Sequence, residues 1–328
     1  MSLILRQIEW VFLIKFGEVT YRGRKFNGGK VSGGRLMVGL GEALWDMLPS
    51  GKHLGGAPLN FAYIASLLGN GAVIASRIGE DLLGREIRSD LNKRNLATSA
   101  IQTDTIFPTG TVDVQFQNGQ PSYDIRKPVA WDALEWSSAW QRLARRSEAV
   151  CFGTLAQRSA ESRSTILRFL EHTQSSCLRV FDINLRKPFY SRMLIEAALP
   201  FTTVLKMNDV ELPEIADMFA IPGQSPVEWM PAMPQKLGVK LLLVTRGEHG
   251  AAASDGSRVV EHPGFAVKVR DTIGAGDAFS AAAAHCLIRG VDLEQTLAFA
   301  NRWASWVASQ AGGMPVLNEE GRRAMSSG

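Results

Sequence analysis

Short apolar runs alternate with amphipathic stretches from residue 36 almost to the end of the chain. The short runs predict buried strands, and the longer stretches, with apolar residues three or four positions apart, predict helices. Such an alternation predicts a doubly wound α/β fold, in which a mostly parallel sheet is flanked by crossover helices. Ligands of these sheets bind at the carboxyl edge of the strands. The predicted strands are 36–40, 72–77, 149–153, 178–184, 203–207 and 240–245, and the predicted helices are 60–68, 81–95, 161–173, 191–199, 208–220 and 227–238.

One stretch breaks this alternation. Residues 111–117 alternate polar and apolar side chains with period two, an Asn-Gly pair supplies a hairpin turn, and residues 122–125 return as a strand. This hairpin, within 107–128, can join the segment 44–54 in a small β-sheet lid over the edge of the main sheet. Because an exposed lid sheet often pairs with a second subunit, we expect a homodimer formed through the lid. An ordinary surface hairpin is the alternative.

The first 36 residues differ from the rest of the chain. They carry seven Lys or Arg and two Asp or Glu, which leaves 29 basic and 30 acidic residues elsewhere. The body is therefore close to neutral, which argues against nucleic acid as a partner. The apolar run 8–16 is far shorter than the roughly 20 residues that a membrane span needs, and the glycine-rich stretch 27–34 is typical of a linker. We predict an extension over 1–36, a folded domain over 37–317 and a tail over 318–328, with no membrane contact.

Composition narrows the possible chemistry. A chain of 328 residues with 45% hydrophobic content can bury a large core. Its three cysteines, an odd number without paired spacing, argue against a disulfide framework or a zinc site and fit a reducing cytoplasm. The five histidines lack metal-ligand spacing. The sequence has neither a Walker lysine motif nor a nucleophile elbow, so it predicts neither a P-loop enzyme nor a serine hydrolase.

The strongest candidate site is the turn Gly274-Ala275-Gly276, which opens a strongly helical segment. The glycines let the backbone approach a ligand closely, and the free N–H groups and dipole of the first helical turn favour a phosphate there. Asp277 lies just inside this turn. An ionised carboxylate beside a phosphate can take a proton from an attacking hydroxyl. A plain turn, with Asp277 as a helix cap, is the alternative.

A second glycine turn precedes an earlier helix. Gly55 and Gly56 allow close backbone approach, and Asn60 offers a polyol both a donor and an acceptor. Upstream, Asp46 lies where the chain leaves the first strand and can accept hydrogen bonds from two sugar hydroxyls. A structural turn at the glycines and a surface carboxylate at Asp46 are the alternatives.

Polar side chains also follow three later strands. Arg186 can stabilise charge on a transferring phosphoryl group. Asn208 and Glu211, three residues apart at a helix start, suit hydrated Mg²⁺, which keeps most of its waters. The strand ending at Thr245 leads into a turn at Gly247 that suits the phosphates or ribose of a nucleotide. Each group alone is equally well explained as a cap or a turn, but their recurrence at successive strand ends favours one shared site.

The early turn at 55–60 and the late turn at 271–277 together resemble the two signatures of the ribokinase-like sugar kinases. The resemblance covers about residues 37–317, and two signatures in this order over that length are highly specific. Within the family, the chain is most similar to the bacterial fructokinases. The segments that carry this closer resemblance are 41–49, 123–132, 152–159 and 181–190.

The resemblance implies roles for the candidate residues. Asp277 would be the catalytic base, and Mg²⁺ would bridge the phosphates of ATP. The anion hole would be formed by Gly274, Ala275 and Gly276, and the sugar site by Asp46, Gly55, Gly56 and Asn60. The ATP site would contain Lys206, Asn208, Thr245, Gly247 and Asn301, and Mg²⁺ would lie near Asn208 and Glu211. A K⁺ ion would lie at Asp271 and Ile273, beside residues 308–313.

The sequence therefore predicts a cytoplasmic, ATP-dependent kinase that phosphorylates a primary hydroxyl of a sugar, with fructose favoured. Ribose, another ketose or a sugar acid are alternative acceptors, although the Asp46 carboxylate would repel an acid. A sugar-sensing module without catalysis is the alternative from another class, and the intact Asp277 argues against it. The chain departs from the family pattern in its N-terminal extension and at Arg246, where a smaller residue is expected.

Overall fold

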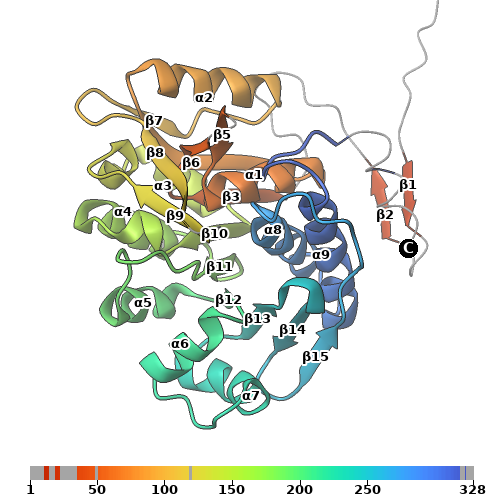
Figure 1. The fold of residues 1–328 in the computed structure, drawn as a ribbon. Coiled ribbons are helices and arrows are strands. Elements are labelled where there is room, and N and C mark those ends of the chain that lie inside the picture. Colours follow the sequence, from red (N-terminus) through yellow and green to blue (C-terminus); the bar gives the residue numbers. More distant parts are fainter. Residues whose placement is uncertain are drawn as a thin grey trace, which may run out of the picture.

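In the computed structural model, helices cover both faces of a nine-stranded sheet, and a smaller four-stranded sheet lies beside it (Figure 1). Near the N-terminus, β1 (Val11–Ile14) pairs with β2 (Val19–Arg22) in antiparallel orientation. The predicted linker at 27–34 and nearly all of the predicted tail lie outside the described residues, so the predicted domain limits are untested. The structure describes residues 11–14, 19–22, 35–48, 51–117, 120–317 and 322.

The large sheet has the strand order β15-β14-β13-β12-β11-β10-β3-β6-β7. The strands from β13 to β7 are parallel, which confirms the predicted doubly wound sheet. The two strands at the other edge are antiparallel, and the sequence did not predict them because the alanine-rich β14 has little strand propensity. The strands are β3 (Leu36–Leu40), β6 (Gly71–Gly79), β7 (Ile101–Asp104), β10 (Ala149–Gly153), β11 (Leu178–Asp182), β12 (Val204–Asn208), β13 (Leu241–Thr245), β14 (Ala251–Ser254) and β15 (Val259–His262).

Two buried apolar clusters lie on opposite faces of the sheet, so the central strands are apolar on both sides. The helices of one cluster are α1 (Ala57–Leu67), α2 (Leu82–Lys93), α8 (Ala275–Leu287) and α9 (Leu293–Ala308). Those of the other are α3 (Ser138–Arg146), α4 (Ala160–Glu171), α5 (Arg192–Ala198), α6 (Glu211–Met218) and α7 (Pro226–Leu237). The described residues also form four short 3₁₀ helices: η1 (Ala130–Ala133), η2 (Leu155–Gln157), η3 (Leu199–Phe201) and η4 (Gly247–His249).

Local chemistry explains where several helices begin. α1 starts three residues before the predicted helix because Pro58 is accommodated in a first helical turn, where it needs no N–H partner. α2 starts at the side chain of Asp81, whose Oδ1 accepts a hydrogen bond of 2.7 Å from the N–H of Gly84. Asp292 begins α9 in the same way, with Oδ1 2.8 Å from the N–H of Gln295.

The smaller sheet has the order β5-β4-β8-β9 and corresponds to the predicted lid. The segment at 44–54 and the hairpin do pair, through a parallel contact between β4 and β8. The Asn-Gly turn of the hairpin lies outside the described residues, and the predicted dimer through the lid is untested. The strands are β4 (Leu44–Leu48), β5 (Gly51–Gly55), β8 (Gly110–Gln117) and β9 (Gln120–Ile125).

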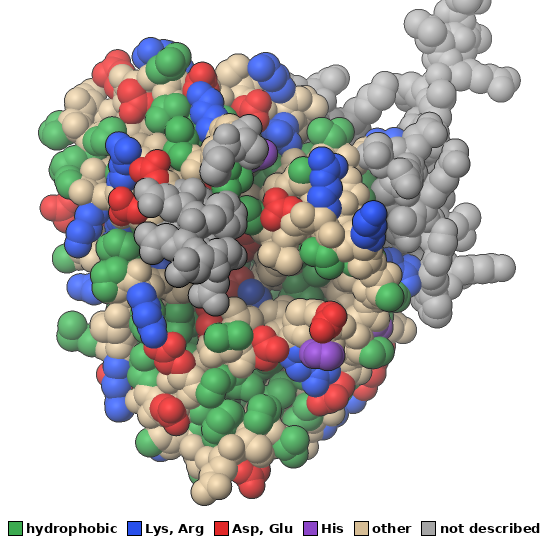
Figure 2. Space-filling view, in the orientation of Figure 1, with side chains coloured by type: hydrophobic (Ala, Val, Ile, Leu, Met, Phe, Trp, Pro, Cys, Tyr) green, Lys and Arg blue, Asp and Glu red, His purple; other side chains and the backbone are tan. Residues whose placement is uncertain are grey.

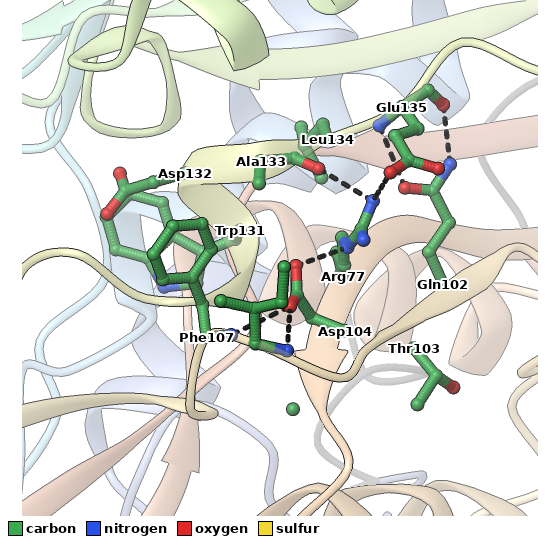
Figure 3. A network of polar contacts seen from close by, with 12 residues as sticks. Arg77, Gln102, Thr103, Asp104, Phe107, Trp131, Asp132, Ala133, Leu134 and Glu135 are labelled. Atoms are coloured by element: carbon green, nitrogen blue, oxygen red, sulfur yellow. Dashed lines mark hydrogen bonds and ion pairs between the residues drawn. The ribbon is translucent and has the colours of Figure 1, made fainter.

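A polar network, buried at Asp104 and exposed at Glu135, fixes the chain where it enters the lid (Figure 3). Arg77 of β6 pairs with Asp104 of β7 at 2.7 Å and with Glu135 at 2.6 Å. Asp104 Oδ1 accepts hydrogen bonds of 2.7 Å from the N–H groups of Ile106 and Phe107. The loop before β8 is therefore tied to the large sheet.

Among the described helices, none combines the length and the apolar character needed to cross a lipid bilayer.

Candidate active site

The two glycine turns that the sequence analysis singled out lie side by side in the structure. Asn60 Nδ2 of α1 donates a hydrogen bond of 2.8 Å to Asp277 Oδ2 of α8, across 217 positions of sequence. The carboxyl ends of β3, β11, β12 and β13 reach the same edge of the sheet. On one face of the molecule, acidic and basic side chains gather in a hollow near its centre (Figure 2).

The turn before α8 requires glycine for steric reasons. Gly274 is the N-cap residue, with a φ of 77°, and no side chain caps the helix there. A Cβ at Gly274 would lie 2.3 Å from the Cα of Gly313, so the two backbones are in direct contact. The side chain of Asp277 accepts a hydrogen bond from Asn60, which argues against the alternative that Asp277 is only a helix cap. The backbone N–H groups at the start of α8 remain suited to an anion.

Gly274→Ala is expected to lower stability by about 1–3 kcal/mol and kcat by at least about tenfold, since one misplaced turn can disrupt a phosphoryl-transfer site. Gly290→Ala is the matched control, because Gly290 has a similar φ of 73° but open space around its Cα. The control carries backbone strain alone and should keep its kcat. Urea unfolding and steady-state kinetics of both variants would measure this, and equal kcat values would contradict the steric account.

A buried ion pair lies directly beneath this turn. Lys206 of β12 and Asp182 of β11 are register partners in the sheet, and Lys206 Nζ lies 3.0 Å from Asp182 Oδ2. Their side chains are 7% and 4% exposed. Ser280 Oγ of α8 also donates to Asp182 Oδ2, at 3.0 Å. A Cβ at Gly276 would lie 3.0 Å from Lys206 Nζ, so the ammonium group lies against the backbone of the anion-binding turn.

Burial and charge change the acidity of this cluster. The pKa of Asp277 is raised to about 6 by burial and by the nearby Asp182 carboxylate, while Asn60, Lys206 and Arg186 oppose the shift. Burial alone would lower the pKa of Lys206, but the surrounding carboxylates, Asp182 first among them, raise it instead. Lys206 therefore stays protonated, and Asp277 can hold or release a proton near neutral pH.

The candidate sugar residues lie on the lid side of this cluster. Asp46 is in the lid strand β4 rather than in a surface turn. A Cβ at Gly55 would lie 2.2 Å from Asp46 Oδ2, and a Cβ at Gly56 would lie 2.5 Å from the carbonyl oxygen of Glu42. Both glycines are therefore needed for close packing. The pKa of Asp46 is raised to about 6, mainly by burial, with Arg186 opposing the shift.

Arg186 lies among the site carboxylates. Its guanidinium is close enough to lower the pKa of Glu42, Asp46 and Asp277, and its Nη1 donates to the carbonyl oxygen of Leu185 at 3.0 Å. The structure thus places Arg186 near Asp277.

Asn208 and Glu211 are both engaged with backbone. Asn208 Oδ1 accepts from the N–H groups of Val210 and Glu211, at 2.9 and 2.8 Å. The Glu211 carboxylate accepts from the N–H groups of Leu185 and Asn208, at 2.7 and 2.8 Å. Among the described residues, no group of three or more His, Cys, Asp or Glu side chains could hold a metal ion. Because backbone N–H groups already occupy these side-chain oxygens, they suit a hydrated Mg²⁺ contacted through its own waters better than a directly ligated ion.

The candidate nucleotide residues are less tightly grouped. Thr245 ends β13, and Gly247 follows in η4 with a φ of 55°. Asn301 is buried in α9, where its Nδ2 donates to the carbonyl oxygen of Leu297 in the same helix, at 2.8 Å. Arg246, the departure from the family pattern, pairs with Glu261 of β15 at 3.2 Å. Its side chain is therefore held toward the antiparallel edge of the sheet.

Asp271 ties two loops together. Its Oδ1 accepts from the N–H of Ile273 and its Oδ2 from the N–H of Gly312, both at 3.0 Å. The N–H of Asp271 donates to the carbonyl oxygen of Ala308 at 3.2 Å. Asp271, one of the two candidate K⁺ residues, thus lies beside residues 308–313.

Three residues of the site were assigned no role from the sequence. Asp182 and Ser280 hold Lys206 and α8 together, and this pairing follows from strand register, which composition does not reveal. Glu42 is 2% exposed and lies near Asp277. The available signal was an acidic residue two positions after an apolar strand, because such positions lie at the ligand-binding edge of the sheet.

Comparison with known proteins relates the chain to carbohydrate kinases. A model of the pfkB family of carbohydrate kinases matches residues 50–320. Fructokinase-1 of Oryza sativa subsp. japonica is 27% identical, and the match covers 87% of this chain and 95% of that protein. The ribokinase of Bacillus subtilis is 29% identical, and the match covers 81% of this chain and 85% of the ribokinase. A sugar kinase of Pyrococcus horikoshii, solved in complex with ATP, superposes with a TM-score of 0.72 at 26% identity, over 88% of this chain and 99% of its own.

Proposed function

The chain belongs to the pfkB family of carbohydrate kinases, and we propose that it transfers the γ-phosphoryl group of ATP to a primary hydroxyl of a sugar, with fructose as its favoured acceptor. The observation that carries this proposal is the contact of 2.8 Å between Asn60 and Asp277. It joins a turn suited to sugar hydroxyls to a helix start suited to phosphate.

In the proposed reaction, Asp277 accepts the proton of the attacking hydroxyl, and Asn60 holds its carboxylate in place. The N–H groups at the start of α8 and the ammonium group of Lys206 stabilise charge on the transferring phosphoryl group. Arg186, in the loop after β11, adds positive charge at the same edge of the sheet. Because these groups are held by buried contacts before substrate binds, catalysis is mainly positioning and electrostatics.

The nucleotide would extend from this turn toward Thr245, Gly247 and Asn301. Asn208 and Glu211 would hold Mg²⁺ through its waters, and the ion would supply positive charge to the phosphates of the nucleotide. A K⁺ ion beside Asp271 and the loop 308–313 is part of the same proposal, since both loops border Gly274. The ATP complex of the related P. horikoshii sugar kinase supports the choice of ATP.

Several features favour fructose. Fructokinases recur among the curated relatives, including a Klebsiella pneumoniae protein at 30% identity. The carboxylates of Asp46 and Glu42 near the sugar turn favour a neutral polyol over a sugar acid. Ribose stays the second candidate, because a ribokinase is as similar as the fructokinases. A homodimer through the lid and a location in the cytoplasm, where the free cysteines Cys151, Cys177 and Cys286 would stay reduced, complete the proposal.

A coupled assay of ADP formation across fructose, ribose, other ketoses and a sugar acid tests this function. We expect kcat/KM to be highest for fructose, and ATP consumption to require both the sugar and Mg²⁺. Faster turnover of ribose or of a sugar acid would replace fructose as the substrate. Sugar binding without ATP consumption for any sugar would favour a sensing module instead.

A further inference from the structure

The segment 312–315, which follows α9, is wedged between the two halves of the candidate active site. A Cβ at Gly313 would lie 2.8 Å from Asn60 Nδ2, and a Cβ at Gly274 would lie 2.3 Å from the Cα of Gly313. The φ of Gly313 is not positive, so space rather than backbone conformation requires glycine there. A displacement of this segment would therefore move the Asn60 amide, the N-cap residue of α8, or both.

The amide of Asn60 depends on this packing. Asn60 is 3% exposed, and its Nδ2 donates the hydrogen bond of 2.8 Å to Asp277. Its Oδ1 is buried and has no hydrogen-bond partner in the described part of the chain. The side chain is thus fixed by one hydrogen bond and by its contact with Gly313. The position of the proposed base is linked in this way to the position of the segment.

Tyr63 of α1 is the first anchor of the segment 312–315. Its hydroxyl donates a hydrogen bond of 2.9 Å to the carbonyl oxygen of Pro315, and its side chain is 3% exposed. Tyr63 follows Asn60 by three residues, so both lie on neighbouring turns of the same helix face. The helix that carries Asn60 therefore also holds the segment that packs on Asn60.

Arg94, the C-cap residue of α2, is the second anchor. Its Nη1 donates a hydrogen bond of 2.6 Å to the carbonyl oxygen of Met314. Its guanidinium carbon lies 5.3 Å from the centre of the Tyr63 ring, within the range of a cation–π contact. Its Nε lies 3.2 Å from Asp90 Oδ2 of the same helix. The guanidinium is thus oriented from two sides toward the carbonyl that it binds.

We propose that Tyr63 and Arg94 are positioning residues for Asn60 and for the anion-binding turn, acting through the segment 312–315. Two of its consecutive carbonyls are held by these side chains, and the N–H of Gly312 is held by Asp271 Oδ2 at 3.0 Å. Gly313 lies between these anchors. The proposal rests on the proposed function, because it assumes that the turn before α8 receives the transferring phosphoryl group.

Tyr63→Phe and Arg94→Met each remove one anchor and keep a side chain of similar length. We expect kcat to fall about tenfold in each, because a small displacement of a phosphoryl-transfer site is costly. The KM values of the sugar and of ATP should stay within about twofold, since the turn acts on charge that develops in the transition state. Arg94→Lys keeps a donor for the Met314 carbonyl and should recover most of the kcat that Arg94→Met loses.

Arg88→Met is the matched control. Arg88 is another half-buried arginine of α2 that donates to backbone carbonyls, those of Thr98 and Ile101, at 3.3 and 2.9 Å. These carbonyls lie between α2 and β7 and not in the segment 312–315. The control should therefore keep the kcat of the wild type. A kcat that falls equally in Arg88→Met and Arg94→Met, or that is unchanged in Tyr63→Phe, would contradict the positioning role.

The direct test is amide hydrogen exchange, measured by mass spectrometry on the unliganded protein. In Tyr63→Phe and Arg94→Met, we expect peptides that cover 308–315 and 271–278 to exchange about fivefold faster, as loss of one hydrogen bond predicts. Helix α7 packs on the opposite face of the sheet and should keep its wild-type exchange. Arg88→Met should match the wild type in all three regions.

Unchanged exchange over 271–278, or equally faster exchange in α7, would overturn the proposal. The first result would show that the segment does not hold the turn, and the second would show a general loss of stability. The exchange measurement needs no turnover. If no sugar is phosphorylated but exchange changes as expected, the proposed function fails while the hold of Tyr63 and Arg94 on the turn is supported.

Discussion

Asp277→Asn is expected to lower kcat by about 10²–10⁴-fold, the usual contribution of a general base. The amide oxygen of asparagine can still accept the hydrogen bond that Asn60 donates, at 2.8 Å in the wild type. The shape of the site should therefore survive, and the Kd of the sugar should change little. Steady-state kinetics gives kcat, and isothermal titration calorimetry gives the sugar affinity.

Asp217→Asn provides the control, because Asp217 is an exposed acid on α6. It should have wild-type kcat and Kd values. Near-normal kcat in Asp277→Asn would rule out Asp277 as the base. A large loss of sugar affinity in that variant would mean that Asp277 mainly binds the substrate.

Asp182→Asn is expected to lower the free energy of unfolding by about 3–5 kcal/mol, the range found when one partner of a buried ion pair is removed. Lys206 and Asp182 are nearly fully buried, and Lys206 Nζ lies 3.0 Å from Asp182 Oδ2. Without the carboxylate, the ammonium group keeps its desolvation penalty and loses its nearest counter-ion. Urea denaturation measures the change.

Two variants make this result interpretable. Adding Lys206→Met to Asp182→Asn should restore part of the lost stability, since a buried pair replaced by uncharged groups is often nearly neutral. Glu196→Gln breaks the exposed pair of Arg192 and Glu196, at 2.8 Å, and should cost no more than about 0.5 kcal/mol. A loss for Asp182→Asn as small as that for Glu196→Gln would contradict the structural role of the buried pair.

The sequence predicts the parallel strands other than β7 because they are largely buried and read as continuous apolar runs. It does not predict β7, whose sequence IQTD is mostly polar. It also predicts the lid, since the hairpin has strict alternation and a strong turn signal. The antiparallel edge was missed because Ala251, Ala252 and Ala253 carry neither β-branching nor alternation. Residues 293–308 form a helix that was not assigned, although the cap at Asp292 marks its start.

For the site, position along the chain predicts which edge of the sheet a residue reaches, but not its partners. The convergence of Asn60 and Asp277 could be expected because each follows a glycine turn before a helix. The pairing of Lys206 with Asp182 depends on the register between β11 and β12. The place of Glu42 depends on how the loop after β3 folds against α1. Neither is visible without the three-dimensional arrangement.

The most direct test of the central claim is the ³¹P NMR spectrum of the wild-type protein after reaction with ATP, Mg²⁺ and fructose. Transfer to a primary hydroxyl joins phosphorus to a CH₂ group, so the account predicts a new phosphomonoester signal split into a triplet, with loss of the γ-phosphate signal of ATP. The signal should be nearly absent with Asp277→Asn at the same reaction time. A doublet, which marks a secondary hydroxyl, or inorganic phosphate alone would contradict the account.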